Sequence, residues 1–143
     1  MGAEPCFQET FPISGGDFTN AGEVSSRVKK ILQELGVANK VIRRATIATY
    51  EAEMNVVWYA RKGTLTLSVT PEKLCIRVED EGEGIADIEL AMKEGYSTAS
   101  SQIRELGFGA GMGLPNIKKN SDEFHIHSVV GQGTFLEICI RRQ

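Results

Sequence analysis

The stretch RVEDEGEGI, from Arg77 to Ile85, restricts the fold more than any other part of the sequence. It continues the strand-like run KLCIRV, in which every second residue is apolar, so Asp80 is expected on the same covered face. Gly82 and Gly84 follow at once and leave the backbone bare where the strand ends. The stretch therefore fits either an Asp-Gly turn or a carboxylate that accepts a hydrogen bond from the amino group of a ligand.

Outward from this stretch, the hydrophobic pattern alternates between helices and strands. Period-two alternation and turn signals predict strands over 7–16 (one or two edge strands), 64–70, 73–80, 123–130 and 134–143. Helical spacing predicts helices over 17–37, 39–63, 85–95 and 114–121. Gly36 is expected to end the first helix, Asn39 and Gly63 to bound the second, and Pro115 to lie in the first turn of the last. This order predicts helices stacked on one face of a mostly antiparallel sheet.

Length, charge and cysteine content limit the class of protein. With 143 residues, of which 41% are hydrophobic, we expect one domain over 1–143 with its own buried core. A net charge of −3 with both signs interspersed argues against nucleic-acid binding, and no apolar run is long enough to span a membrane. Cys75 and Cys139 lie in apolar runs and Cys6 makes the number odd, which favours buried reduced thiols and a cytoplasmic protein over a disulfide framework.

A glycine-rich stretch, GFGAGMGLPNIKK (107–119), leads into the last predicted helix. It contains four alternating glycines, Gly107, Gly109, Gly111 and Gly113. No Lys-Ser or Lys-Thr follows as in a P-loop, and Met112 and Leu114 break the dinucleotide-binding pattern. The stretch nevertheless ends at a helix N-terminus, where free N–H groups and the helix dipole favour a phosphate. The alternative interpretation is a disordered surface loop.

Two further places put polar residues beside the predicted core. In the helix over 39–63, YEAEMN sets Glu51 and Asn55 four residues apart, along the edge of the apolar stripe. They are either a solvated flank or a carboxylate base beside an oxygen ligand for a hard cation such as Mg²⁺. In GQGT, Thr134 shares a face with the apolar residues of the last strand. The apolar stripe is predicted to consist of Ile47, Tyr50, Met54, Val57 and Trp58.

In this order, the four places resemble the motifs of the GHKL ATP-binding family, which includes domains of histidine kinases, gyrase, Hsp90 and the mismatch-repair ATPases. YEAEMN, DEGEGI, the glycine-rich stretch and GQGT look like its N, G1, G2 and G3 boxes. The resemblance implies the Bergerat ATP-binding fold, a two-layer α/β sandwich. VEDEGEGIADIELAMKEGYSTA (78–99) and GFGAGMGLPNIKKNSDEF (107–124) look most like the anti-sigma-factor serine kinases and stress-response switch kinases. We therefore expect no separate helical region with a phosphorylated histidine, as a sensor histidine kinase would need.

The resemblance implies a role for each motif residue. Glu51 matches the carboxylate that activates the acceptor serine, and Asn55 the residue whose oxygen reaches Mg²⁺. Asp80 matches the aspartate that accepts a hydrogen bond from the adenine amino group, with Gly84 leaving room for the base and Thr134 supporting it through water. The remaining residues assigned to the nucleotide site are Gly82, Ile85, Gly107, Gly109, Gly111, Met112, Gly113 and Leu114. Those from the glycine-rich stretch form the lid over the phosphates.

The implied activity is that of an ATP- and Mg²⁺-dependent serine/threonine protein kinase in a bacterial partner-switching module that regulates transcription. Its implied substrate is a serine on a STAS-domain antagonist. The same motifs also fit a nucleotide-gated binding protein that sequesters a sigma factor or another regulator with little or no phosphate transfer. A third reading is a free-standing catalytic module of a histidine kinase.

Several residues outside the motifs are open to two interpretations. Phosphate neutralisation or plain solvated surface is expected for Arg104, Lys118 and Lys119. Trp58 stands near the position where many relatives carry a histidine after the asparagine. Solvent exposure rather than metal binding is expected for His125 and His127. A homodimer is permitted, without being required, by the apolar residues of the first edge strand, Phe7, Phe11 and Ile13.

Overall fold

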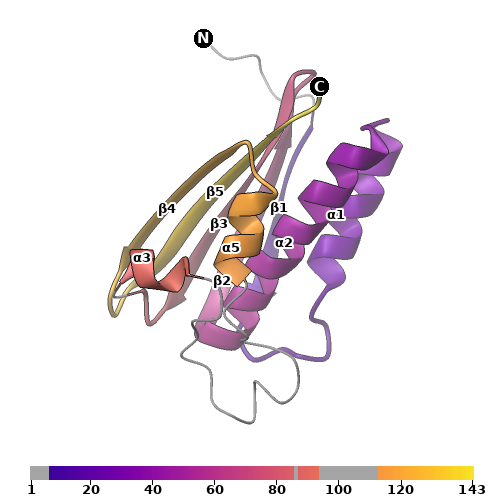
Figure 1. The fold of residues 1–143 in the computed structure, drawn as a ribbon. Coiled ribbons are helices and arrows are strands. Elements are labelled where there is room, and N and C mark those ends of the chain that lie inside the picture. The colour runs from indigo at the N-terminus through magenta and orange to yellow at the C-terminus, as the bar shows by residue number, and fades with distance from the viewer. Residues whose placement is uncertain (1–6, 86, 94–112) are drawn as a thin grey trace.

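The computed structural model describes residues 7–85, 87–93 and 113–143. The described strands form one antiparallel sheet with the order β1-β2-β3-β5-β4, and α1, α2 and α5 cover one face of it (Figure 1). The strands are β1 (Phe7–Ser14), β2 (Ala60–Val69), β3 (Lys73–Gly82), β4 (Glu123–Val129) and β5 (Gly133–Arg141). The helices are α1 (Glu23–Glu34), α2 (Asn39–Tyr59), α3 (Ile88–Ala91) and α5 (Gly113–Lys119). The predicted two-layer architecture is confirmed.

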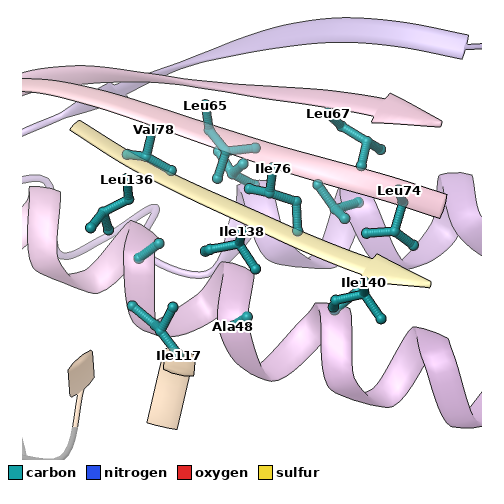
Figure 2. Packing of buried hydrophobic residues seen from close by; sticks show 14 of the residues in the cluster. Ala48, Leu65, Leu67, Leu74, Ile76, Val78, Ile117, Leu136, Ile138 and Ile140 are labelled. Atoms are coloured by element: carbon teal, nitrogen blue, oxygen red, sulfur yellow. The ribbon is translucent and has the colours of Figure 1, made fainter. Parts of the chain in front are cut away.

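The core lies between the sheet and α2. Alternate residues of the central strands point toward the helices, and they meet an alanine-lined face of α2 (Figure 2). Ala45, Ala48 and Ala52 are all fully buried, and their small side chains let the helix backbone lie close to the sheet. Ile117 of α5 is also fully buried. It packs into the core beside α2, on the side of α2 that faces away from α1. This packing fixes α2 and α5 side by side above the sheet.

The N-terminus of α1 is held by a carboxylate of α2. Gly22 precedes the helix with a φ of 96°, and α1 has no side-chain cap of its own. Instead, the buried Glu53 accepts hydrogen bonds from the backbone N–H groups of Gly22 (3.0 Å), Val24 (3.2 Å) and Ser25 (3.0 Å). These N–H groups have no partner within the helix, and the helix dipole favours a negative charge there. Glu53 therefore orders α1 against α2.

We expect Glu53→Gln to destabilise the fold by about 2–3 kcal/mol, because the amide nitrogen cannot accept the two N–H groups that bond Oε2. A shift in the denaturant midpoint with an unchanged m-value would measure this. Glu34→Gln, which changes an exposed glutamate at the other end of α1, is the matched control and should leave the midpoint unchanged. Equal losses in both variants would contradict the capping role of Glu53.

The first predicted helix begins later than expected, at Glu23 instead of residue 17. It ends just before Gly36, as predicted. Gly36 has a φ of 74°, and the N–H of Val37 bonds the carbonyl of Leu32 at 3.0 Å, which is the pattern of a glycine-terminated helix. Leu35, the C-cap residue, is 37% exposed. The polar segment before residue 23 is not helical and forms the connection from β1.

The second predicted helix ends at Tyr59, four residues earlier than expected. Residues from Ala60 onward pair with β3, with Ala60 opposite Gly82 and Gly63 opposite Asp80. A Cβ atom on Gly63 would lie 2.9 Å from the carbonyl oxygen of Glu79, so this glycine is needed for close strand packing. It does not end the helix. The predicted start is confirmed, because α2 begins at Asn39, with Ala38 as the N-cap residue.

The apolar stripe predicted for α2 is only partly correct. Met54 and Val57 are buried, but Ile47 and Tyr50 are 38% and 39% exposed. The buried face is wider than one stripe because α2 packs against both the sheet and α1. It therefore includes small and polar residues, Ala45, Ala48, Thr49, Ala52 and Glu53. Ile47 and Tyr50 lie toward the solvent side of α2, where the Tyr50 ring borders the start of α1.

Cys75 and Cys139 form a disulfide, so the expectation of reduced thiols is wrong for this pair. The two residues face each other in register on β3 and β5, and their Cα atoms are 4.2 Å apart. They are separated by 64 residues in the sequence, so the pairing follows from the strand register rather than from local spacing. Cys6 lies outside the described residues. The expectation of a cytoplasmic protein loses this part of its support.

Two other predictions about the strands are confirmed, and one is not. β1 is a single edge strand, and Pro12 lies within it. Phe11 and Ile13 point into the core and are 6% exposed, so their side chains are not available for contact with a second copy. His125 and His127 are exposed on β4.

Within the described part of the chain, no helix is both long and apolar enough to cross a membrane.

Candidate nucleotide-binding site

One half of the candidate site lies between α2 and α5. Glu51 and Asn55 are half-buried one turn apart on α2. A Cβ atom on Gly113 would lie 3.4 Å from both Glu51 Oε2 and Asn55 Oδ1, so the first residue of α5 is in contact with both side chains. Asn116, one turn into α5, bonds the Glu51 carboxylate through its side-chain amide. The two oxygen-bearing side chains are therefore held at the N-terminus of α5.

The environment of Glu51 favours its protonated form more than water does. Burial raises the pKa of its carboxyl above the ordinary value, and the hydrogen bond from Asn116 lowers it by a smaller amount. Desolvation disfavours the charge, and a donor to the carboxylate favours it. A higher pKa makes the ionised carboxylate a stronger proton acceptor than a fully hydrated glutamate. This is the property that a general base needs.

The other half of the site lies where β3 ends beside β5. Asp80 follows the buried residues of β3 in the alternation, and its carboxyl is half-buried as predicted. Its Oδ1 accepts a hydrogen bond from the backbone N–H of Thr134 at 3.0 Å. Burial raises the pKa of Asp80, and this hydrogen bond partly offsets the effect. Oδ2 has no hydrogen-bond partner within the described segments, which leaves it able to accept from a ligand.

Ser128 connects the elements around Asp80 and was not among the residues predicted from the sequence. Its hydroxyl oxygen accepts the N–H of Ile85 at 2.7 Å and lies 2.8 Å from the hydroxyl of Thr134. It also donates to the carbonyl of Gly133 at 3.1 Å. Ser128 continues the half-buried alternation of Phe124 and Ile126 on β4, so strand periodicity could have placed it on this face. It ties the segment after β3 to the hairpin between β4 and β5.

Two glycines of the motifs allow this close approach of backbones. Gly84 has a φ of 76°, and a Cβ atom there would lie 2.4 Å from the carbonyl oxygen of Val129. A Cβ atom on Gly133 would lie 2.0 Å from the carbonyl oxygen of Asp80. Both positions thus exclude a side chain for structural reasons alone. The part of Gly84 in leaving room for a base remains a prediction.

The structure brings most of the described candidate residues to one end of the molecule. Figure 1 shows the end of α2, the start of α5, the end of β3 and the start of β5 at the same end. Gly82 lies at the last position of β3, Ile85 follows it, and Leu114 is buried at the start of α5. Several candidates lie outside the described residues, namely Arg104, Gly107, Gly109, Gly111 and Met112. Their role in a phosphate lid remains a prediction.

Three other predicted residues lie at the margin of the site. Lys118 and Lys119 are exposed in the last turn of α5, where their charges complement the helix dipole. Trp58 is half-buried on α2, and its ring packs against Phe18 with centroids 4.4 Å apart. A role of these residues in nucleotide binding remains a prediction.

The described residues fit a nucleotide bound with magnesium. A half-buried carboxylate with a free acceptor oxygen suits an exocyclic amino group, as adenine has. An amide oxygen suits Mg²⁺, which keeps several waters and takes few protein ligands beside the phosphates of a substrate. Asp80 supplies the first feature and Asn55 the second, and the N-terminus of α5 begins beside Asn55. The described residues therefore include groups suited to the adenine base and groups suited to the magnesium-bound phosphates.

Comparison with known proteins identifies the class. Residues 17–140 match the histidine kinase-like ATPase domain family. The match covers most of the chain, so this protein belongs to that family of ATPase domains. ATP is accordingly the ligand that the family implies.

Particular relatives lie among bacterial regulators. The chain is 34% identical over 113 residues to the serine/threonine-protein kinase RsbT of Bacillus subtilis (strain 168), covering 76% of this chain and 79% of the relative. It is 26% identical over 118 residues to the anti-sigma F factor of Thermoanaerobacter sp. (strain X514), covering 82% and 75%. The crystal structure of the SiaB–SiaC complex from Pseudomonas aeruginosa superposes with a TM-score of 0.64 at 14% identity, covering 96% of this chain and 90% of that chain. The last likeness concerns the fold alone.

Proposed function

We propose that this chain is a cytoplasmic, single-domain serine/threonine protein kinase of a bacterial partner-switching module, which uses ATP and Mg²⁺ to phosphorylate a serine on a STAS-domain antagonist. The observation that carries the proposal is the pairing of Glu51 and Asn55 at the start of α5. A carboxylate with a raised pKa and an oxygen ligand for a cation lie together there. The likeness to a serine/threonine-protein kinase over most of both chains supports the same activity.

Each of these residues would have a distinct role in such a reaction. When bound, ATP would supply its terminal phosphoryl group and leave as ADP, and Mg²⁺ would neutralise the charge that develops during the transfer. Asp80 orients the nucleotide through its base, and Asn55 offers its oxygen to the cation. Glu51 accepts the proton of the acceptor hydroxyl, with its carboxylate oriented by Asn116. Phosphoryl transfer depends mainly on positioning and charge, so these few groups are sufficient.

A second candidate function is nucleotide-gated sequestration of a sigma factor. It is favoured by the similarity to proteins named anti-sigma F factor, which covers 82% of this chain. In that case the nucleotide would set the conformation of a binding surface, and phosphate transfer would be slight. The same residues would bind the nucleotide, but Glu51 would no longer act as a general base.

The test uses terminally labelled ATP and Mg²⁺ in a lysate of the organism that produces the protein, with Glu51→Ala in parallel. A labelled, acid-stable protein band that requires Glu51 is the expected result, and it would supply the acceptor for further work. If no protein in the lysate is labelled although the purified wild-type protein binds ATP, the result would favour sequestration. An acid-labile product would instead indicate phosphohistidine and a histidine-kinase module.

A further inference from the structure

The outer face of α2 carries an apolar patch that reaches the candidate catalytic carboxylate. Ile47 is 38% exposed and lies one helical turn before Glu51 on the same side of the helix. Tyr50 is 39% exposed, three residues after Ile47, and therefore its neighbour on the helix surface. The Tyr50 ring lies against the start of α1, because a Cβ atom on Gly22 would be 3.8 Å from its Cε2. The patch is thus fixed in position beside Glu51.

No described element covers this face. The sheet lies beneath α2, α1 lies along one flank and α5 along the other, and none of the described helices or strands lies on the remaining side (Figure 1). Single exposed apolar residues are ordinary in proteins. Here two neighbouring ones adjoin Glu51, a half-buried carboxyl whose pKa is raised by burial. Their position relative to Glu51 sets them apart from Leu35, which is equally exposed at the end of α1.

Toward the start of α2, the same face becomes basic. Arg43 lies one turn before Ile47, and Lys40 lies three residues before Arg43. Both are exposed, and across the described ranges neither forms a salt bridge. Arg44, by contrast, pairs with Asp122 at 3.2 Å on the α5 side. Two unneutralised positive charges thus extend the patch away from Glu51.

We propose that Lys40, Arg43, Ile47 and Tyr50, the α2 stripe, form the docking face for the protein that carries the acceptor hydroxyl. This rests on the proposed kinase function, because such a protein must bring its hydroxyl to Glu51, where the stripe ends. The helical rise sets the spacing of the complementary groups. The partner presents an apolar side chain about 6 Å from its acceptor hydroxyl and a carboxylate about 12 Å from it along the same line. The acidic group complements Arg43, and the apolar group covers Ile47 and Tyr50.

Docking on the stripe predicts a selective kinetic effect. The probe is the acceptor protein purified from the labelled band described above. Ile47→Ser and Tyr50→Ser are each expected to raise the KM for that protein about tenfold, because burial of an apolar side chain is lost. The kcat at saturating acceptor and the affinity for ATP should not change. Leu35→Ser, at 37% exposure, is the matched control and should leave every constant unchanged.

The charge part of the stripe has its own variant. Arg43→Glu is expected to raise the KM for the acceptor about tenfold at low salt, and the difference from wild type should shrink at high salt because the charges are screened. Lys30→Glu changes an exposed lysine on the outer side of α1 and serves as the control.

The outcomes separate the two proposals. If the wild-type protein labels no acceptor, the kinase function fails and the docking face fails with it. If labelling occurs but Ile47→Ser and Tyr50→Ser keep the wild-type KM, or Leu35→Ser raises it equally, only the docking face is overturned. Unchanged melting temperatures and ATP affinities in the variants exclude misfolding as the cause of a raised KM.

Discussion

Replacing Glu51 by Gln is expected to lower the single-turnover rate of phosphate transfer by about 10²- to 10⁴-fold, the usual effect of removing a general base. The amide can still accept the hydrogen bond from Asn116 through its oxygen, so the local geometry should persist. It cannot take a proton from the acceptor hydroxyl. The affinity for Mg-ATP should therefore change by less than about threefold, since the lost step belongs to the transition state.

The pH dependence of the same variant provides an independent check. The pKa of Glu51 is raised above the ordinary value of 4.5, so kcat/KM should fall on the acid side at a pH above 4.5 as the carboxylate is protonated. Glu51→Gln should lack this acid limb. An identical limb in wild type and variant would assign the titration to another group, and an unchanged transfer rate would remove Glu51 from the mechanism.

The stability of this variant should move in the opposite direction to its activity. Because the folded-state pKa of Glu51 is raised, its proton favours folding, and that contribution is present below pH 4.5 and lost as the pH rises through the folded-state pKa. At neutral pH the ionised, half-buried carboxylate therefore destabilises the fold. Glu51→Gln should melt at a higher temperature than wild type at pH 7.5, and the difference should narrow toward pH 4. Calorimetry at both pH values measures this.

The parts of the fold that could be predicted from the sequence are those set by local periodicity. Alternation along KLCIRVED placed Asp80 on the covered face, and the structure has its carboxyl half-buried there. A strand has only two faces, so period two leaves little choice. The helix that carries Glu51 allowed more error, because burial against both the sheet and α1 widened its buried face to include alanines and Glu53. Ile47 and Tyr50 were consequently assigned to the wrong side.

The contacts missed by sequence reasoning join residues that are distant in the chain. Glu53 bonds backbone groups of Gly22, Val24 and Ser25 about 30 residues earlier, and no local pattern marks a glutamate for that purpose. Cys75 and Cys139 meet only because β3 and β5 pair in one register. Such contacts are set by tertiary packing, which one sequence does not display.

Replacing Asp80 by Asn is expected to weaken ATP binding by about 10- to 100-fold, while the fold remains intact. The asparagine oxygen can still accept the N–H of Thr134, so the link between β3 and β5 is kept. The amide nitrogen then takes the place of Oδ2 and faces the adenine amino group, which is also a donor. The loss of a hydrogen bond to a charged acceptor, about 1.5–3 kcal/mol, gives the expected magnitude.

The same substitution should change the choice of base, and this distinguishes recognition from general damage. Hypoxanthine has a carbonyl where adenine has its amino group, and an amide nitrogen can donate to that carbonyl. Asp80→Asn should therefore lower the ratio of ATP affinity to ITP affinity, as measured by titration calorimetry with both nucleotides. Glu79→Gln is the matched control, because Glu79 is the preceding carboxylate of β3 and is exposed on the opposite face of the sheet. An equal loss of ATP affinity in both variants, or an unchanged ratio in Asp80→Asn, would contradict base recognition by Asp80.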